Sequence, residues 1–386
     1  MLILAGVTIA ALSGDNGILT RAKEAKEKTV QAQKDEEKNL TNMEDILNNV
    51  ANFNNINIEN TNPAGAMPAN VTILENDANK GIVIKDKNGN EWVWVEVPKT
   101  TVFEDLTIDT AKEFTEQNYT DIKNKLIAYA TVYREGASGQ RRYWTDEWYE
   151  GCGLTKEEYT KTYQKVLKSI YTYGGFWIGR YEAGIEGSID DVNKARTSHS
   201  TITVGTSPKA ISQKDAIPYN YVYCSEAQAL AKKMTPDSNY VSSLMFGIQW
   251  DLVCKFLEVK GGLAIAEVNS NSSNWGNYND VERTITSEKA KQQAVLPWTV
   301  ITGKKPASSV LLSTGASDET NKMNIYDFAG NEWEWTFENT SDSDNPCAFR
   351  GGSYLYIGGY PAAHRWASYT TDSGASIGFR PTLYVN

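Results

Sequence analysis

The chain has 386 residues, of which 40% are hydrophobic and 11% aromatic, so it can bury a sizeable core. Its net charge of −10, without a visible basic patch, argues against a nucleic-acid partner. Only two histidines are present, His199 and His364, which argues against zinc or iron sites built from several histidines.

The N-terminal 76 residues differ in composition from the rest of the chain. Residues 1–12 are apolar throughout but too few to span a bilayer, which takes about 20 residues. We expect them to be the end of a longer membrane segment. Residues 18–50 are rich in Lys, Glu, Ala and Gln with few apolar positions, which predicts a solvated helical stalk. Residues 51–76 are Asn-rich with two prolines and are predicted to be a linker.

The sequence of residues 1–30 closely matches a known pattern. The stretch LILAGVTIAALSGDNGILTRAKEAKEKT resembles the N-terminal region of type IV pilin-like surface proteins of clostridia-like bacteria. The resemblance implies a long pilin-like helix over residues 1–50. It also implies a location at the cell surface, either through a membrane anchor or in a filament built from copies of the chain.

A main domain is expected from residue 77 to 386. Asn88-Gly89 between two alternating stretches predicts a β-hairpin. Further elements follow in chain order: helices at 120–133 and 155–170, a strand at 174–183, helices at 225–233 and 244–257, and a long ordered loop region at 268–322. Strands scattered among helices without a βαβ rhythm predict an α+β fold.

Two further features are an alternating run of residues and a set of four cysteines. The alternation in Glu332-Trp333-Glu334-Trp335 predicts a strand with one aromatic face buried. The four cysteines, at 152, 224, 254 and 347, form no C-x-x-C pair and allow three pairings or none. They are too sparse for a disulfide scaffold, so we expect mostly buried, small hydrophobic side chains.

The main domain contains four motifs in a characteristic order along the chain. They are GGFWIGRYEAG (174–184), DFAGNEWEWT (327–336), RGGS (350–353) and GFR (378–380). In this order they resemble the formylglycine-generating enzyme (sulfatase-modifying factor) superfamily. The resemblance implies a C-type-lectin-like α+β domain over residues 77–386.

The resemblance also bears on catalysis. The enzymes carry a cysteine pair in the pattern RGGS-x-x-C-x-x-x-x-C, and the matching positions here are Tyr356 and Pro361. Neither side chain can bind copper as a thiolate or form a disulfide. We therefore expect a non-catalytic member of the superfamily, of the surface or variable-protein branch.

A structural Ca²⁺ site is implied at the turn before WEW. By position, its ligands are the side chains of Asp327 and Glu334 and the carbonyls of Gly330 and Glu332, an all-oxygen set that suits a hard cation. The alternative is that Asp327 and Glu334 cap the turn and pair with Arg350 or Arg380.

Residues 354–376 are the candidate ligand site. They contain no Lys, Glu, Gln or Met. This composition, apart from Trp366, is similar to that of segments in lectin-fold variable proteins that diversity-generating retroelements mutate at adenines. The residues expected to be exposed and to contact ligand are Tyr354, Tyr356, Tyr360, His364, Trp366, Ser368, Tyr369, Thr371 and Asp372. The alternative for each aromatic residue is packing in the core.

These features predict a ligand-binding protein displayed on a cell surface or pilus. Its extracellular ligand, a protein or a glycan, is unknown. Two alternatives remain open: a structural filament subunit, and an enzyme of the sulfatase-modifying-factor type with altered chemistry.

Overall fold

The computed structural model describes residues 21, 23–34, 61–134, 144–294 and 297–386. Two compact units divide the chain, Met1–Asn52 and Phe53–Asn386. In the first unit, residues 23–34 are helical with exposed side chains. The apolar stretch 1–12 and most of the predicted stalk lie outside the described residues. Among the helices that are described, none is both long and apolar enough to cross a bilayer.

The larger sheet of the second unit has six strands in the order β1-β2-β3-β5-β18-β8, and each neighbouring pair is antiparallel. Its strands are β1 (Thr72–Glu75), β2 (Val83–Lys85), β3 (Glu91–Glu96), β5 (Gly175–Gly179), β18 (Pro381–Val385) and β8 (Tyr240–Leu244). The predicted hairpin is β2–β3. Because β1 joins this sheet, residues 72–75 belong to the domain, and the predicted linker extends too far along the chain.

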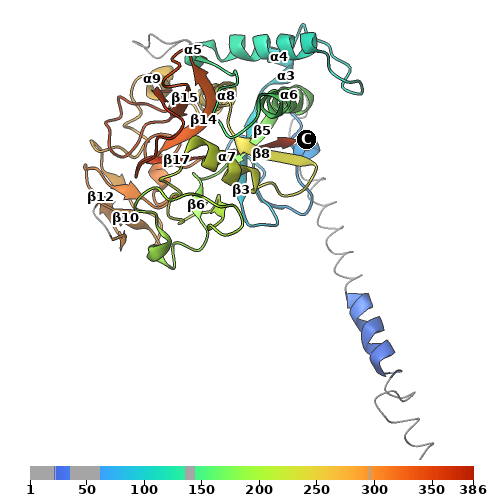
Figure 1. Cartoon of the computed structure of the whole chain (residues 1–386), viewed down its shortest axis with the longest axis horizontal. Coiled ribbons are helices and arrows are strands. Elements are labelled where there is room, and N and C mark those ends of the chain that lie inside the picture. Colours follow the sequence, from blue (N-terminus) through green and yellow to red (C-terminus); the bar gives the residue numbers. More distant parts are fainter. Residues whose placement is uncertain (1–20, 22, 35–60, 135–143, 295–296) are drawn as a thin grey trace, which may run out of the picture. The chain divides into compact units, whose positions relative to one another are not determined.

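A second sheet carries the motifs that organise the C-terminal part (Figure 1). It runs in the order β16-β15-β14-β17, with β4 also paired to β14. The strands are β16 (Arg365–Ser368), β15 (Cys347–Arg350), β14 (Trp333–Thr340), β17 (Ile377–Phe379) and β4 (Trp144–Thr145). Trp333 and Trp335 are buried as predicted, but Glu334 between them is buried as well. The prediction of a single buried face is therefore wrong, because Glu334 has an internal partner in Arg380.

The longest described helix of the domain, α6 (Lys156–Tyr173), packs against β5 and β18 of the six-stranded sheet. Thr155 caps α6 in a reciprocal pair with Glu158, and the left-handed Gly174 ends it. The other helices are α3 (Lys99–Val102), α4 (Glu116–Tyr129), α5 (Thr131–Arg134), α7 (Cys224–Lys232), α8 (Gly247–Val259) and α9 (Ile265–Asn269), with 3₁₀ turns at Ala64–Ala66, Val192–Lys194 and Asp318–Thr320. The helix predicted at 244–257 begins later, at Gly247, because Leu244 is the last residue of β8.

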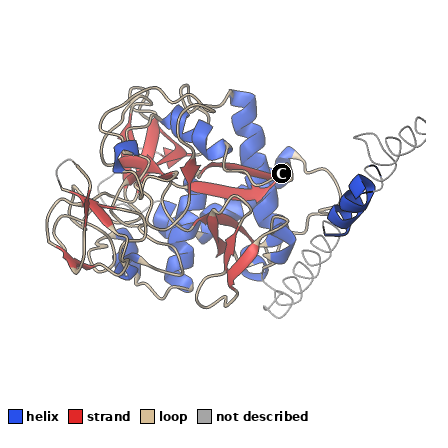
Figure 2. Ribbon diagram, turned by 90° about the horizontal axis from the view of Figure 1, so that it is seen from below, coloured by secondary structure: helices blue, strands red, loops and turns tan. Residues whose placement is uncertain are grey.

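The region predicted as one long loop, 268–322, contains several short strands. They are β9 (Arg283–Thr284), β10 (Lys291–Gln293), β11 (Thr299–Val300), β12 (Lys304–Lys305) and β13 (Leu311–Leu312), and a further small pair joins β6 (Gly184–Ile185) to β7 (Ala210–Ile211). Figure 2 shows the short strands of this part of the domain set among long loops. Strands of two or three residues are too short to give an alternation signal.

Candidate functional site

The candidate site is built on the loop 351–364, which joins β15 to β16. Arg350 and Arg365 are opposite each other in the strand register and close the base of this loop. Both guanidinium groups are buried. What holds these two arginines therefore also holds the loop.

Five charged side chains hold the base in a buried ion cluster. Asp251 Oδ1 accepts from Arg350 at 2.9 Å and from Arg365 at 2.6 Å. Glu338 accepts from the same two arginines at 2.9 Å each and from Arg134 at 2.8 Å. Arg134 also pairs with Asp146, which accepts hydrogen bonds from the first two amides of α8. With Asp146 included, three arginines balance three carboxylates, so the buried cluster carries no net charge.

The middle of the loop is held by the segment 268–280. Asn279 donates its backbone N–H to Tyr356 O (2.9 Å) and its side-chain amide to Leu355 O (2.7 Å). Ser272 donates its N–H to Gly358 O at 2.9 Å, and its hydroxyl accepts from Ala362 N at 3.0 Å. These bonds use the polar groups of the loop backbone internally and leave side chains to face outward.

Gly352 is required by this arrangement. Its φ is +79°, a conformation that costs other residues about 1–2 kcal/mol. A Cβ atom at this position would lie 2.2 Å from Tyr360 O and 2.8 Å from the Tyr278 ring. Tyr278 Oη in turn donates to Tyr360 O at 2.9 Å, so residues 352 and 360 of the loop are held close to each other.

An aromatic cluster lies on this frame. The Trp333 ring is at its base, with ring centroids 5.8 Å from Tyr356, 6.3 Å from Tyr360, 5.7 Å from His364 and 6.1 Å from Trp366. The Tyr356 and Tyr360 rings are 4.7 Å apart. Trp333 is 2% exposed, whereas Trp366 is 40% exposed. We call these five residues the aromatic cluster.

Two aliphatic side chains extend the apolar character of the loop. Leu355 is 42% exposed and Ile357 is 51% exposed, and both flank Tyr356 in the chain. Monomeric proteins rarely place several large apolar side chains together in solvent unless they contact a partner there. The loop and the cluster thus present a surface suited to binding.

The structure divides the nine predicted ligand-contacting residues. Tyr356, Tyr360, His364 and Trp366 come together in the aromatic cluster. Tyr369 lies elsewhere, in a hollow of about 680 Å³ lined also by residues 149–151 and 339–344. Thr371 is exposed and Asp372 is half-buried, accepting from Ser368 Oγ at 2.7 Å.

Two of the nine are not exposed as predicted. Ser368 is 3% exposed because its hydroxyl is bonded to Asp372. Tyr354 is 7% exposed because its ring packs into a small apolar cluster with Ile217, Trp298 and Leu311. For Tyr354, the alternative of core packing holds.

Trp333 belongs to the site although its place in the sequence predicted only a buried strand residue. The alternation of Trp333 with Trp335 predicts a shared buried face, and both are indeed buried. Its contacts to rings 23–33 residues further along depend on how β15 and β16 pair with β14, which local periodicity does not reveal.

The two positions that the resemblance matches to the enzymes' cysteine pair lie within or beside the cluster. Tyr356 is part of it, and Pro361 is buried in the same loop. All four cysteines are buried, as expected, and none forms a disulfide, which the sequence had left open. Burial raises the pKa of the Cys224 and Cys254 thiols to about 12, so these sulfurs stay protonated at neutral pH.

His364 is neutral at physiological pH. Burial, with the positive charges of Arg350 and Arg365, lowers its pKa to about 4. The imidazole therefore joins the cluster as an uncharged aromatic ring. Since its folded pKa lies below the unfolded value of about 6.5, its contribution destabilises the protein as pH falls from about 6.5 to 4.

The predicted calcium turn is a buried acidic region. Asp327 accepts from Gly315 N and Thr320 Oγ1, each at 2.7 Å. Glu334 is paired with Arg380 at 2.8 Å, as in the alternative that the sequence left open. Burial raises the pKa of Glu334 to about 7.

The Glu332 side chain adds to the negative charge of this region. It is 1% exposed, and burial and the nearby Glu334 carboxylate raise its pKa, although the Asn220 side chain lowers it in part. Oxygen donors in excess of cationic partners are chemically compatible with a hard cation. However, no group of three or more His, Cys, Asp and Glu side chains in the described ranges is placed to hold a metal.

The two sheets, the helices around them and the motifs that they place together define a mixed α+β domain of the formylglycine-generating-enzyme type. Residues 145–383, more than half of the chain, match the sulfatase-modifying factor enzyme 1-like domain. The chain belongs to this family.

Two solved structures are similar to the chain at low sequence identity. The variable protein 1 of Treponema denticola is 15% identical, with 55% of this chain and 85% of that chain covered and a TM-score of 0.31. CarF is 14% identical, with 55% and 87% covered and a TM-score of 0.32. No curated protein matches the chain.

Proposed function

We propose that the protein is a non-catalytic ligand-binding member of this family, with the aromatic cluster and the adjoining Leu355 and Ile357 as its binding surface. One observation carries the proposal: the buried Trp333 ring supports an exposed Trp366, and the aliphatic side chains of Leu355 and Ile357 beside them are exposed as well. Hot spots of protein interfaces are enriched in Trp and Tyr side chains that pack closely against their neighbours.

The frame beneath the surface supports the same proposal. The loop is closed at its base by Arg350 and Arg365 and held along its length by Asn279 and Ser272. A surface that is ordered before binding loses less conformational entropy when it meets a ligand. The alternative function, an enzyme with altered chemistry, has less support because the cluster holds no thiol and a pKa of about 4 makes His364 a weak base.

A matched pair of isoleucine variants tests the proposal. Ile357 and Ile265 are 51% and 45% exposed, but only Ile357 adjoins the cluster. The wild type, Ile357→Ser and Ile265→Ser would be compared on arrays of surface glycans and extracellular proteins. We expect the Ile357 variant to lose about tenfold in affinity for any ligand of the wild type, which is about 1.4 kcal/mol.

The Ile265 variant serves as the control and is expected to bind like the wild type. If both variants lose affinity equally, or if neither variant loses affinity, the ligand binds away from the aromatic cluster. Melting curves of both variants separate lost binding from lost folding.

Surface display is part of the proposal. The resemblance of residues 1–30 to pilin-like proteins supports an anchor or a filament, and the domain would then present its cluster outside the cell. A structural filament subunit and a ligand-binding protein are compatible roles for one chain.

Diversification of the loop by a retroelement is likewise proposed, from the composition of residues 354–376. We expect the neighbouring DNA to hold a near-copy of the 3′ coding region, differing at adenines, beside a reverse transcriptase gene. Sequencing that region is the measurement. A region without such a copy would leave a ligand site of fixed sequence.

A structural Ca²⁺ at the acidic turn also remains a proposal. Burial and the nearby carboxylates of Asp327, Glu332 and Glu334 raise the pKa of Glu182, and this excess of acidic groups supports a bound cation. We expect the melting temperature to rise on adding calcium and to fall with a chelator, because a ligand of the folded state stabilises it. Identical melting curves in the two conditions would mean that Arg380, Gly315 and Thr320 satisfy the turn without a metal.

A further inference from the structure

Two basic side chains are buried as a pair next to the segment that holds the loop 351–364. Lys305 of β12 and Arg283 of β9 are opposite each other in the strand register. Lys305 is 0% exposed and Arg283 is 6% exposed. Among the described residues, the pair forms one ion pair, from Arg283 to the largely exposed Glu319 at 3.8 Å. Buried positive charges are costly without strong acceptors, so other groups must stabilise them.

Backbone carbonyls of the segment 273–282 are these acceptors. Arg283 donates to three of them and Lys305 donates to two. The five acceptors are Ser273 O, Gly276 O and Glu282 O for Arg283, and Tyr278 O and Val281 O for Lys305. The segment contains no regular helix or strand of its own. Its backbone is therefore held in shape largely by two side-chain cations.

Lys305 makes these contacts as an ammonium group at neutral pH. Burial and the nearby charge of Arg283 lower the pKa of Lys305 to about 8, and Asp280 offsets this in part. At pH 7 the side chain is therefore still mostly protonated. Hydrogen bonds from a charged donor are roughly twice as strong as those between neutral groups.

The same segment carries the loop 351–364. Tyr278, whose carbonyl accepts from Lys305, donates its own hydroxyl to Tyr360 O at 2.9 Å. The next residue, Asn279, donates to Leu355 O and Tyr356 O, as described above. Asp280 Oδ1 accepts from Gly358 N at 3.2 Å. Three consecutive residues thus join the carbonyls that the cations bind to the backbone of the loop.

We propose that Lys305, together with Arg283, is a positioning residue of the aromatic cluster. It acts through the segment 273–282, which sets the conformation of the loop 351–364. An apolar side chain at position 305 would leave Tyr278 O and Val281 O without their donor, and the segment would have to move to bring these carbonyls to water. The importance of this for binding rests on the proposed function, but the positioning itself is measurable without a ligand.

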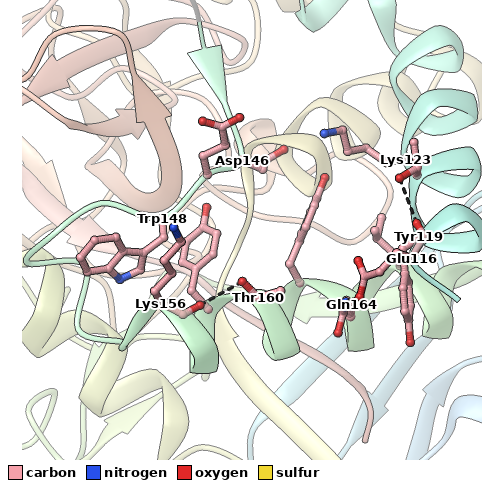
Figure 3. A pocket seen from close by; sticks show the side chains of 13 residues that line it. Glu116, Tyr119, Lys123, Asp146, Trp148, Lys156, Thr160 and Gln164 are labelled. Atoms are coloured by element: carbon pink, nitrogen blue, oxygen red, sulfur yellow. Dashed lines mark hydrogen bonds between the residues drawn. The ribbon is translucent and has the colours of Figure 1, made fainter. Parts of the chain in front are cut away.

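Fluorine NMR of the full chain labelled with 5-fluorotryptophan, at pH 7, tests the proposal. The Trp366 resonance, assigned with Trp366→Phe, reports on the aromatic cluster. Trp148 is the internal reference, because it lies in the wall of a hollow between α4 and α6 (Figure 3), well apart from β12 (Figure 1). We expect Lys305→Met to shift or broaden the Trp366 resonance and to leave the Trp148 resonance unchanged.

Lys304→Met is the matched control. Lys304 is the neighbouring residue of β12, but its side chain is exposed and pairs with Glu282 at 3.2 Å. We expect it to behave like the wild type. Hydrogen exchange of the same proteins should show amides of residues 353–364 exchanging at least about tenfold faster in Lys305→Met, with amides of β5 and α6 unchanged.

Arg283→Lys provides a second, milder variant that decides the matter if Lys305→Met does not fold. It keeps a buried positive charge, but one ammonium group cannot reach three carbonyls in the way that the guanidinium does. We expect a smaller change in the same direction at Trp366 and in residues 353–364.

Three results would overturn the proposal. They are an unchanged loop and Trp366 resonance in the variants that fold, an equal change in Lys304→Met, and faster exchange throughout the domain rather than in the loop. All of these readouts are taken on the ligand-free chain. A failure to find a ligand for the aromatic cluster would therefore count against the proposed function and not against the role of Lys305.

Discussion

Replacing Glu338 with Gln is expected to lower the free energy of unfolding by roughly 3–5 kcal/mol, as for other buried ion pairs that lose one partner. Glu338 accepts from Arg134, Arg350 and Arg365, and all three guanidinium groups are buried. The amide keeps the shape of the side chain but not its charge. Three buried arginines would then face two carboxylates.

Chemical denaturation of the wild type and two variants measures this effect. The matched control is Glu157→Gln, since Glu157 also forms an ion pair, with Lys161 at 2.6 Å, but both side chains are exposed. We expect no measurable change in the control because exposed pairs contribute little. Similar stability of Glu338→Gln and the wild type would contradict a structural role for the buried ion cluster.

The buried ion cluster also predicts that the protein loses stability in acid. Burial alone would raise the pKa of Glu338, but Arg365, Arg350 and Arg134 together lower it to about 2. The folded-state pKa is then below the unfolded value of about 4.3, so the unfolded state binds more protons between these values. The contribution of Glu338 is present above about pH 4.3 and is lost as pH falls toward 2.

The second large effect is expected at Gly352. Gly352→Ala should destabilise the protein by roughly 3 kcal/mol or more, because strain at a positive φ adds to overlap with backbone. The new Cβ would meet Tyr360 O at 2.2 Å, and this carbonyl is itself held by Tyr278. The loop would have to move, and we expect ligand binding to fall with stability.

Gly303→Ala is the matched control for this prediction. Gly303 has a similar φ of +75°, but a Cβ there would have no atom within 4 Å. We expect it to cost about 1–2 kcal/mol from backbone strain alone. Equal costs in the two variants, measured by denaturant unfolding, would show that the loop yields easily around position 352.

Much of the fold follows from local sequence signals. Thr155 with Glu158 marks the start of α6, and Asn88-Gly89 marks the β2–β3 turn; both act between residues close in the chain. The family follows from motif order. What local signals miss is the strand at Thr72–Glu75, which reads as linker because it is short, half-exposed and flanked by Asn and Pro.

The candidate site was predictable in part. Tyr356, Tyr360, His364 and Trp366 were identified from composition and come together in space. The burial of Tyr354 could not be predicted, because its apolar neighbours Ile217, Trp298 and Leu311 come from distant segments. For the same reason, the base formed by Trp333 and the three-arginine cluster beneath the loop depend on tertiary pairing that periodicity does not encode.

Hydrogen exchange of the full chain, with and without a ligand identified on the arrays, tests the central claim most directly. A ligand bound at the aromatic cluster should slow exchange of backbone amides in residues 353–366, while distant segments such as α4 and α6 exchange at unchanged rates. Protection at other segments, with residues 353–366 unaffected, would contradict the assignment of the aromatic cluster as the binding surface.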